Sequence, residues 1–212
     1  LFIGSFQRLG VLPRSGIGCR PFDHYRDGFL MSEAAAAICL ESNTALPFSR
    51  SACEARPEAP PIAIERYAQG ADATHLTSSD PAGRVLRHLI NKVTHNNPID
   101  LIHAHGTGTL TNDPIELAAL ESVFASATQT PYLYSHKGAL GHSLGAAGLV
   151  SVVLNVLAHQ QHQVPPNIRT TNPLATAHVT IHPTTHHARI HRSLALAAGF
   201  GGATAAISLI SL

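Results

Sequence analysis

The chain has 212 residues, which is enough for one domain with a sizeable core and is also a common size for half of a larger fold. Charged residues make up 13% and the formal net charge is +1, which argues against nucleic acid or an anionic membrane surface as partner. No apolar run reaches the roughly 18 residues that cross a bilayer, so we expect no membrane span. The odd cysteine count, without CxxC spacing, argues against disulfides and a metal site and favours the cytoplasm (Cys19, Cys39 and Cys53).

Strands and helices are predicted to alternate along the first half of the chain. Residues 28–42 are apolar and small on both faces, which predicts a buried central strand, and the Pro-rich residues 43–61 predict a loop. Residues 62–69 alternate as a strand does. Asp80 followed by Pro81 predicts the start of a helix, whose apolar residues recur at helical spacing (Val85, Leu89, Ile90 and Val93).

The second half continues the alternation and then places strands in succession. Asp113 as N-cap and Pro114 at the first helical position predict a helix that runs to about Phe124. Further strands are predicted at 98–104, 131–135, 177–182, 193–200 and 202–210, and a buried helix at 143–160. We therefore expect a single α/β domain over residues 1–212, with a mixed five-stranded sheet.

Three residues at predicted strand ends are of the types that stabilise anions. His105 precedes a Gly-Thr-Gly-Thr turn, and Lys137, one of two lysines, lies between a strand and the buried helix. His142 stands at the start of that helix, where the helix dipole disfavours the imidazolium form. Neutral imidazoles donate hydrogen bonds to a developing oxyanion, and a buried ammonium adds to the local field. Each residue alone is also compatible with a purely structural role.

Five segments, in chain order, resemble the C-terminal half of β-ketoacyl synthases, the condensing enzymes of fatty-acid and polyketide assembly. They are CRPFDHYRDGFLMSEAAA (19–36), ADATHLTSSDP (71–81), HAHGTGTLTNDPIE (103–116), SHKGALGHSLGAAG (135–148) and GFGG (199–202). The resemblance implies the thiolase-like layered αβαβα architecture. It also implies a 3-oxoacyl-[acyl-carrier-protein] synthase, which catalyses decarboxylative Claisen condensation of malonyl-carrier protein with an acyl thioester.

The same resemblance implies roles for the strand-end residues. His105 and His142 would polarise the malonyl thioester carbonyl, and Lys137 would pair with Glu116. The alternative for Lys137 and Glu116 is a buried ion pair that is structural only. No cofactor is expected on this chain, because the substrate is carried on the phosphopantetheine of an acyl carrier protein.

The resemblance also implies roles for residues in the turns near these histidines. Thr107 and Thr109 would contact the phosphopantetheine arm. In GFGG, Phe200 would gate the site and contribute its backbone N–H to an oxyanion hole, with Gly201 beside it. A second gating loop would contain Asp72, His75 and Thr77, for which an ordinary Asp/Thr turn is the alternative.

Several residues depart from the family pattern. The family's nucleophilic cysteine lies in a T-A-C-S-like turn at a helix start, and this chain has no such turn. Thr204 replaces an asparagine, Ala198 an aromatic residue, and alanines replace the glycines after Glu33. We therefore expect an N-terminal half, on the same or a separate polypeptide, to supply the cysteine.

Partners and alternatives follow from the same comparison. The expected partners are the N-terminal half, an acyl carrier protein, and a second copy or a heterologous ketosynthase subunit. One alternative is a non-catalytic partner resembling a chain-length factor, which the combination of His105, Lys137 and His142 disfavours. A thiolase acting on coenzyme A esters is a third possibility, disfavoured by the KGALGH segment.

Overall fold

The computed structural model describes residues 2–14, 16, 18–42 and 60–212. Its centre is a six-stranded sheet with the order β1-β8-β7-β2-β3-β5. The strands are β1 (Ile62–Ala71), β2 (Leu101–His103), β3 (Tyr132–Tyr134), β5 (Thr180–Ile181), β7 (Arg192–Ala198) and β8 (Ala203–Ser211). β8 pairs antiparallel with β1 and with β7, whereas the pairs β7–β2, β2–β3 and β3–β5 are parallel. The expected α/β class with a mixed sheet is confirmed, with six strands rather than five.

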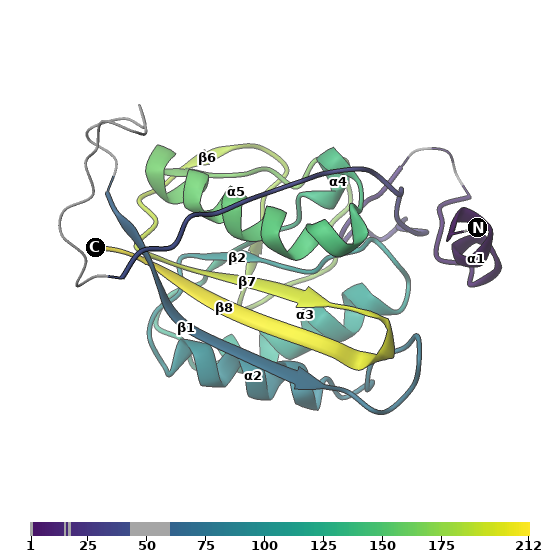
Figure 1. Ribbon diagram of the computed structural model, residues 1–212, viewed down its shortest axis with the longest axis horizontal. Helices are drawn as coiled ribbons and strands as arrows, with labels where there is room; N and C mark the ends of the chain where they lie inside the picture. Colours follow the sequence, from purple (N-terminus) through teal and green to yellow (C-terminus); the bar gives the residue numbers. More distant parts are fainter. Residues whose placement is uncertain (1, 15, 17, 43–59) are drawn as a thin grey trace.

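Helices cover both faces of this sheet (Figure 1). On one face lie α2 (Arg84–Thr94) and α3 (Asn112–Phe124), whose buried residues share one core with those of the sheet (Leu89, Ile90, Leu120, Ile102, Leu133 and Leu194). On the other lies α5 (Ala147–Gln161), where Val152 packs with Ala195 and Leu209. The sequence folds in this way because α2 has an apolar stripe, whereas α3 and α5 are apolar on average, and packing on a sheet face removes these apolar residues from water.

The remaining elements are short, and the sequence patterns do not predict them as separate elements. They are α1 (Phe2–Arg8), α4 (Lys137–Leu140), the 3₁₀ turns η2 (Leu144–Ala146) and η3 (Phe200–Gly202), and a two-stranded sheet of β4 (Gln163–Val164) and β6 (His186–His187). Elements of two to seven residues contain too few turns of a helix or too few alternations to produce a periodic pattern.

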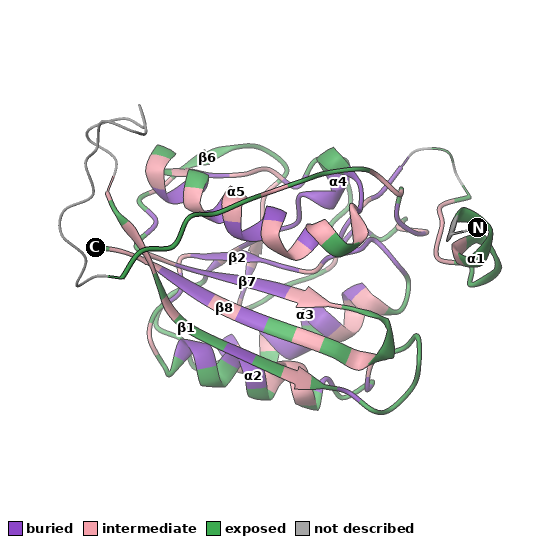
Figure 2. Cartoon of the chain, in the orientation of Figure 1, coloured by how far each residue is buried: buried purple, intermediate pink, exposed green. Residues whose placement is uncertain are grey.

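The prediction of a buried central strand at 28–42 is wrong. In this segment the only pairing is an isolated bridge from Met31 to His142, and the chain passes in extended form across the outer side of α5 (Figure 2). Leu40 is 68% exposed. Small apolar residues are typical of a segment that is buried by other parts of a protein. Among the described residues, however, none packs against the outer side of this segment. The Pro-rich segment 43–61 and Cys53 lie almost wholly outside the described residues.

Neither predicted N-cap residue is the N-cap in the structure. α2 begins at Arg84 with Gly83 as its N-cap, and Asp80 instead shapes the preceding turn, where it accepts the backbone N–H groups of Ala82 and Arg84. Asp113 is not the N-cap of α3. It lies inside the first turn, and its carboxylate instead accepts the N–H groups of Gly108 and Phe22.

The expectation that no segment is apolar enough to cross a membrane is also wrong. Leu144–Gln161 passes the criterion of length and composition, with 18 residues and a mean hydropathy of 1.2. In the structure α5 instead forms part of the core, because Val152 packs on the sheet and Asn155 and His159 hydrogen-bond to it. A core helix meets the same criterion as a membrane span.

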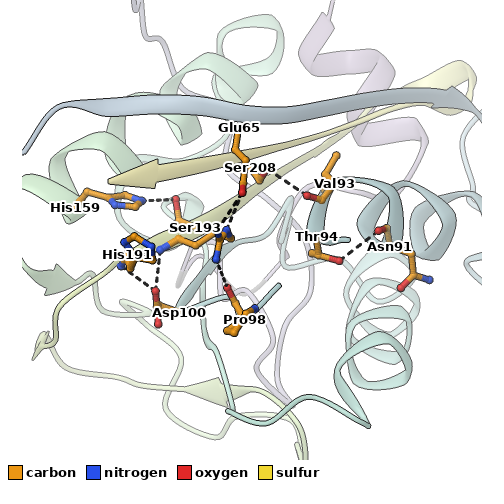
Figure 3. A network of polar contacts seen from close by, with 11 residues as sticks. Glu65, Asn91, Val93, Thr94, Pro98, Asp100, His159, His191, Ser193 and Ser208 are labelled. Carbon is orange, nitrogen blue, oxygen red and sulfur yellow. Dashed lines mark hydrogen bonds and ion pairs between the residues drawn. The ribbon is translucent and has the colours of Figure 1, made fainter. Parts of the chain in front are cut away.

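The amino ends of β2 and β7 are fixed by a polar network far from the histidines singled out above (Figure 3). Asp100 accepts the backbone N–H groups of His191 and Arg192, both at 2.8 Å. Arg192 forms an ion pair with Glu65 at 2.8 Å, and Ser208 donates to the carbonyl of Val93. These contacts therefore hold the parallel strands in register at their amino ends. The carboxyl ends of the strands take no part in this network.

His159 on α5 provides a test of this packing. Its ring lies between the hydroxyls of Ser193 and Ser211, each at 2.8 Å, and burial lowers its pKa from 6.5 to about 4. As the pH falls from 6.5 to about 4, the unfolded chain takes up this proton and the folded chain does not, so stability falls. We predict that H159Q reduces the slope of unfolding free energy against pH in this window by about one proton.

The measurement is urea unfolding at a series of pH values, with the exposed His88→Gln as the control for loss of a histidine. An unchanged slope in H159Q would show that His159 is not held neutral in the folded chain.

Candidate active site

The carboxyl ends of the neighbouring parallel strands β2 and β3 bring the predicted residues together. His105 lies two residues after β2, and Lys137 lies three residues after β3, at the start of α4. His142 lies two residues after the end of α4 and two residues before η2. The ring centroids of His105 and His142 are 5.5 Å apart and their planes are inclined by 79°. The joint role that the resemblance implies for His105 and His142 requires the two imidazoles to converge on one pocket, and they do.

Both rings line a cavity of about 320 Å³. Four other residues to which the sequence assigns a role also line this cavity, namely Thr77, Thr107, Thr109 and Phe200. Residues that sequence analysis did not single out complete the wall, notably Phe6, Phe29, Leu76, Asn112, Ile115 and Leu144. All of them except Phe6 lie inside the motif segments quoted above, but a motif does not show which of its side chains face the cavity.

Burial keeps both imidazoles neutral. It lowers the pKa of His105 well below its usual value, and the nearby Lys137 charge lowers it further. The same two causes lower the pKa of His142 to about 3. The backbone N–H of Leu144 donates to Nδ1 of His142 at 3.2 Å, so the single proton of this neutral ring is on Nε2. His142 is therefore available as a hydrogen-bond donor through Nε2.

Lys137 and Glu116 hold the two sides of one peptide group. The Glu116 carboxylate accepts the N–H groups of His105 at 2.7 Å and Gly106 at 2.8 Å, and Asn112 donates to it as well. The Lys137 ammonium donates to the carbonyl oxygen of His105. Both charged groups are almost fully buried, and burial raises the pKa of Glu116 and lowers that of Lys137.

The predicted direct ion pair between Lys137 and Glu116 is therefore wrong. Among the ion pairs of the described residues, none joins these two side chains within 4.0 Å. The reason is that both oxygens of Glu116 are occupied by amide groups of the turn, and Lys137 approaches the same turn from its carbonyl side. The two charges act on each other through the His105–Gly106 peptide group, which fixes the position of His105.

The threonines of the HGTGT turn are close to each other and to the cavity. Thr107 Oγ1 and Thr109 Oγ1 are 3.0 Å apart, and Thr109 also accepts the N–H of Asn112. The turn needs glycine at 106, where φ is +41° and a Cβ atom would lie 2.6 Å from Cβ of Ser135. This close approach brings the turn against the β3–α4 connection.

The two loops expected to form a gate contact each other. The N–H of Gly201 donates to the carbonyl of Leu76 at 2.7 Å, and the N–H of Asp72 donates to the carbonyl of Gly202 at 2.9 Å. The side chain of Asp72 shapes its own loop, since it accepts the N–H groups of Thr74 and Asp80. These amides hold the pKa of Asp72 below its usual value.

The residues of these two loops differ in how exposed they are and in whether they line the cavity. Phe200 is 49% exposed, and its ring is 5.9 Å from that of Phe6. Thr77 lines the cavity, whereas His75 is exposed, lies outside the lining, and accepts the N–H of Thr77 on Nδ1. Asp72 is buried and lines a smaller cavity, which also reaches His105, instead of the main one.

The described cysteines are not placed as nucleophiles in this cavity. Cys19 is buried, its thiol donates to the carbonyl of Thr107 at 3.1 Å, and burial raises its pKa to about 12. Cys39 is exposed in the segment that crosses α5. Among the described residues, no group of three or more His, Cys, Asp or Glu side chains is arranged to hold a metal ion.

Known proteins that are similar to this chain were found by comparison of sequence and of structure. Residues 63–171 match the family described as "Beta-ketoacyl synthase, C-terminal domain". The chain is 36% identical over 202 residues to "Putative polyketide beta-ketoacyl synthase 1" of Streptomyces cyaneus, covering 90% of this chain and 45% of that protein. It is 33% identical to "3-oxoacyl-[acyl-carrier-protein] synthase 2" of Mycobacterium leprae, covering 73% of this chain and 36% of that protein.

Solved structures agree with the sequence matches. The structure described as "The ishigamide ketosynthase/chain length factor" superposes with a TM-score of 0.84 at 29% identity, over 100% of this chain and 51% of that one. This chain thus spans between about a third and about half of the length of these relatives. The sequence match and the thiolase-type neighbours confirm the resemblance found in the sequence, and the chain belongs to the family of β-ketoacyl synthase C-terminal domains.

Proposed function

We propose that this chain supplies the histidine and lysine part of the active site of a 3-oxoacyl-[acyl-carrier-protein] synthase in fatty-acid or polyketide elongation. The observation that carries the proposal is the pair of neutral imidazoles, 5.5 Å apart, that line one cavity. Two neutral donors at this separation can share one oxygen atom that acquires negative charge.

The chemistry follows from that arrangement. When the malonyl thioester loses CO₂, the electron pair of the broken C–C bond moves onto the thioester as an enolate, whose oxygen accepts hydrogen bonds from His105 and His142. The enolate carbon then attacks the carbonyl of the acyl thioester, forming a new C–C bond and releasing a thiolate. The cysteine that carries the acyl group comes from outside this chain in our proposal.

The cavity walls suit a substrate on a phosphopantetheine arm, and no separate cofactor is included in the proposal. The hydroxyls of Thr107 and Thr109 are hydrogen-bonding groups beside the histidines, and the arm carries amides that need such partners. Phe200 and Gly201, with the loop of Asp72, His75 and Thr77, would open and close the entrance. Their mutual contacts support coupled movement.

The proposed partners are the segment with the nucleophilic cysteine, an acyl carrier protein, and a second copy or a heterologous ketosynthase subunit, in the cytoplasm. A ketosynthase with a chain length factor is described for the structural neighbour. A purely structural, chain-length-factor-like role for this chain is less well supported, because such a role needs no neutral histidine pair with a buried lysine.

The first test removes the proposed donors. In the intact synthase that contains this chain, we predict that H142A and H105A each lower the rate of malonyl-carrier-protein decarboxylation by about 10²-fold or more, as expected when a preorganised oxyanion donor is lost. Release of labelled CO₂ measures the rate. C19S and C39S should retain near wild-type rates, because neither residue lines the cavity that contains the histidine pair.

The proposal is contradicted if wild-type synthase shows no decarboxylation above buffer. Acylation of Cys19 or Cys39 by a labelled acyl thioester would contradict it equally.

A second test concerns the charge on Lys137. K137M keeps the aliphatic stem but loses the ammonium that holds the His105 carbonyl. We predict that condensation falls by about tenfold or more while the far-ultraviolet circular dichroism spectrum is retained, since a shift of the imidazole by a fraction of an ångström reduces donor strength. Full turnover in a folded K137M protein would leave Lys137 with a structural role only.

A further inference from the structure

A continuous line of polar side chains lies between α5 and the sheet, and the proposed chemistry does not use it. It consists of His136, His103, Asn155, Ser193, His159 and Ser211, and successive partners are 2.7 to 3.2 Å apart. All of these residues except Ser211 are buried. A buried polar line of this kind needs every member hydrogen-bonded, so the position of each proton can be worked out.

The direction of the hydrogen bonds is fixed first at Asn155. Its Nδ2 donates to the carbonyl of Leu194, which places Oδ1 toward His103. An amide oxygen only accepts, so His103 carries its proton on Nδ1. The backbone N–H of His136 also points at Nε2 of His103, at 3.4 Å, which agrees with an unprotonated Nε2.

His136 must then donate to His103. Nε2 of His103 is an acceptor, so the 2.7 Å contact to Nδ1 of His136 requires the proton on that Nδ1. This leaves Nε2 of His136 as a lone pair, and that atom is buried without a partner among the described residues. An unpaired acceptor is less costly in a protein interior than an unpaired N–H.

The far half of the line has the same direction. The hydroxyl of Ser211 donates to the carbonyl of Ile190, so it accepts from Nδ1 of His159. Ser193 accepts from Nδ2 of Asn155, so its hydrogen points to Nε2 of His159. All the donors from His136 to Ser211 therefore point away from the candidate active site.

The near end of this line is joined to the turn that bears Lys137. His136 stands between Ser135, whose hydroxyl donates to the carbonyl of Gly106, and Lys137, whose ammonium donates to the carbonyl of His105. These two contacts join the β2 and β3 ends on the cavity side. The contact between His136 and His103 joins the same two strand ends on the side of α5.

We propose that His136 and His103, anchored by Asn155, are positioning residues for the condensing site, and this role rests on the proposed function. Through its Nδ1–H, His136 fixes the Ser135–Lys137 turn against β2, so that the ammonium meets the His105 carbonyl. Neither ring lines the main cavity, and both act through Lys137 and His105.

Neutron diffraction of the intact synthase tests the proton positions without any assay. We expect deuterium on Nδ1 of His136, His103 and His159, and none on their Nε2 atoms. Deuterium on Nε2 of His103 would reverse the first link and overturn the inference, even if the enzyme is fully active.

Kinetics of malonyl-carrier-protein decarboxylation tests the positioning role. H136L removes the donor, and we expect kcat to fall by about tenfold or more with KM changed less than about twofold. In H136N the side-chain NH₂ occupies the place of Nδ1–H, so we expect kcat within about threefold of wild type. S208A, which loses a buried hydrogen bond to Val93 at the far end of the sheet, is the control and should retain wild-type kcat.

The outcomes separate the two proposals. An active wild type with equal kcat in H136L, or with equal losses in H136L and H136N, overturns the positioning role and leaves the proposed function intact. A wild type without decarboxylation refutes the proposed function and the positioning role together. If H136L does not fold, the kcat of H136N and the neutron structure still decide the matter.

Discussion

The arrangement of the candidate site depends on one peptide group, between His105 and Gly106, that two buried charges hold from opposite sides. The Glu116 carboxylate accepts its N–H, and the Lys137 ammonium donates to its carbonyl oxygen. Each charge would be costly in the interior alone. Together they are hydrogen-bonded, of opposite sign and separated by a polar group, so desolvation is offset and the backbone at His105 has one allowed position.

The sheet topology explains how residues far apart in sequence reach this peptide group. β2 and β3 are parallel neighbours, so the segments that follow them leave the sheet at the same edge and bring His105 beside Lys137. At the other end, Asp100 ties β2 to β7 through two backbone amides. A sheet fixed at its amino ends can present short loops at its carboxyl ends without losing their register.

Sequence predicted the strand-end residues well because a motif marks them, and it predicted the contact of His105 with His142 correctly. It failed where the same residue types have several possible partners. Glu116 and Lys137 are near one another as expected, yet backbone amides compete successfully for the carboxylate. His103 and His136 could not be recognised among fifteen histidines, because their pairing depends on which face of the sheet α5 covers. Segment 28–42 has the composition of a core strand, but composition does not specify what covers it.

In the proposed reaction His105 and His142 act as neutral donors to a single oxygen atom. This can be tested with a crystal structure of the intact synthase bound to a malonyl thioester analogue that cannot lose CO₂. We predict the thioester oxygen at about 3 Å from one ring nitrogen of each histidine, with Nε2 as the nitrogen of His142. A bound analogue whose thioester oxygen contacts neither ring, or whose carboxylate pairs with an imidazolium at neutral pH, would contradict it.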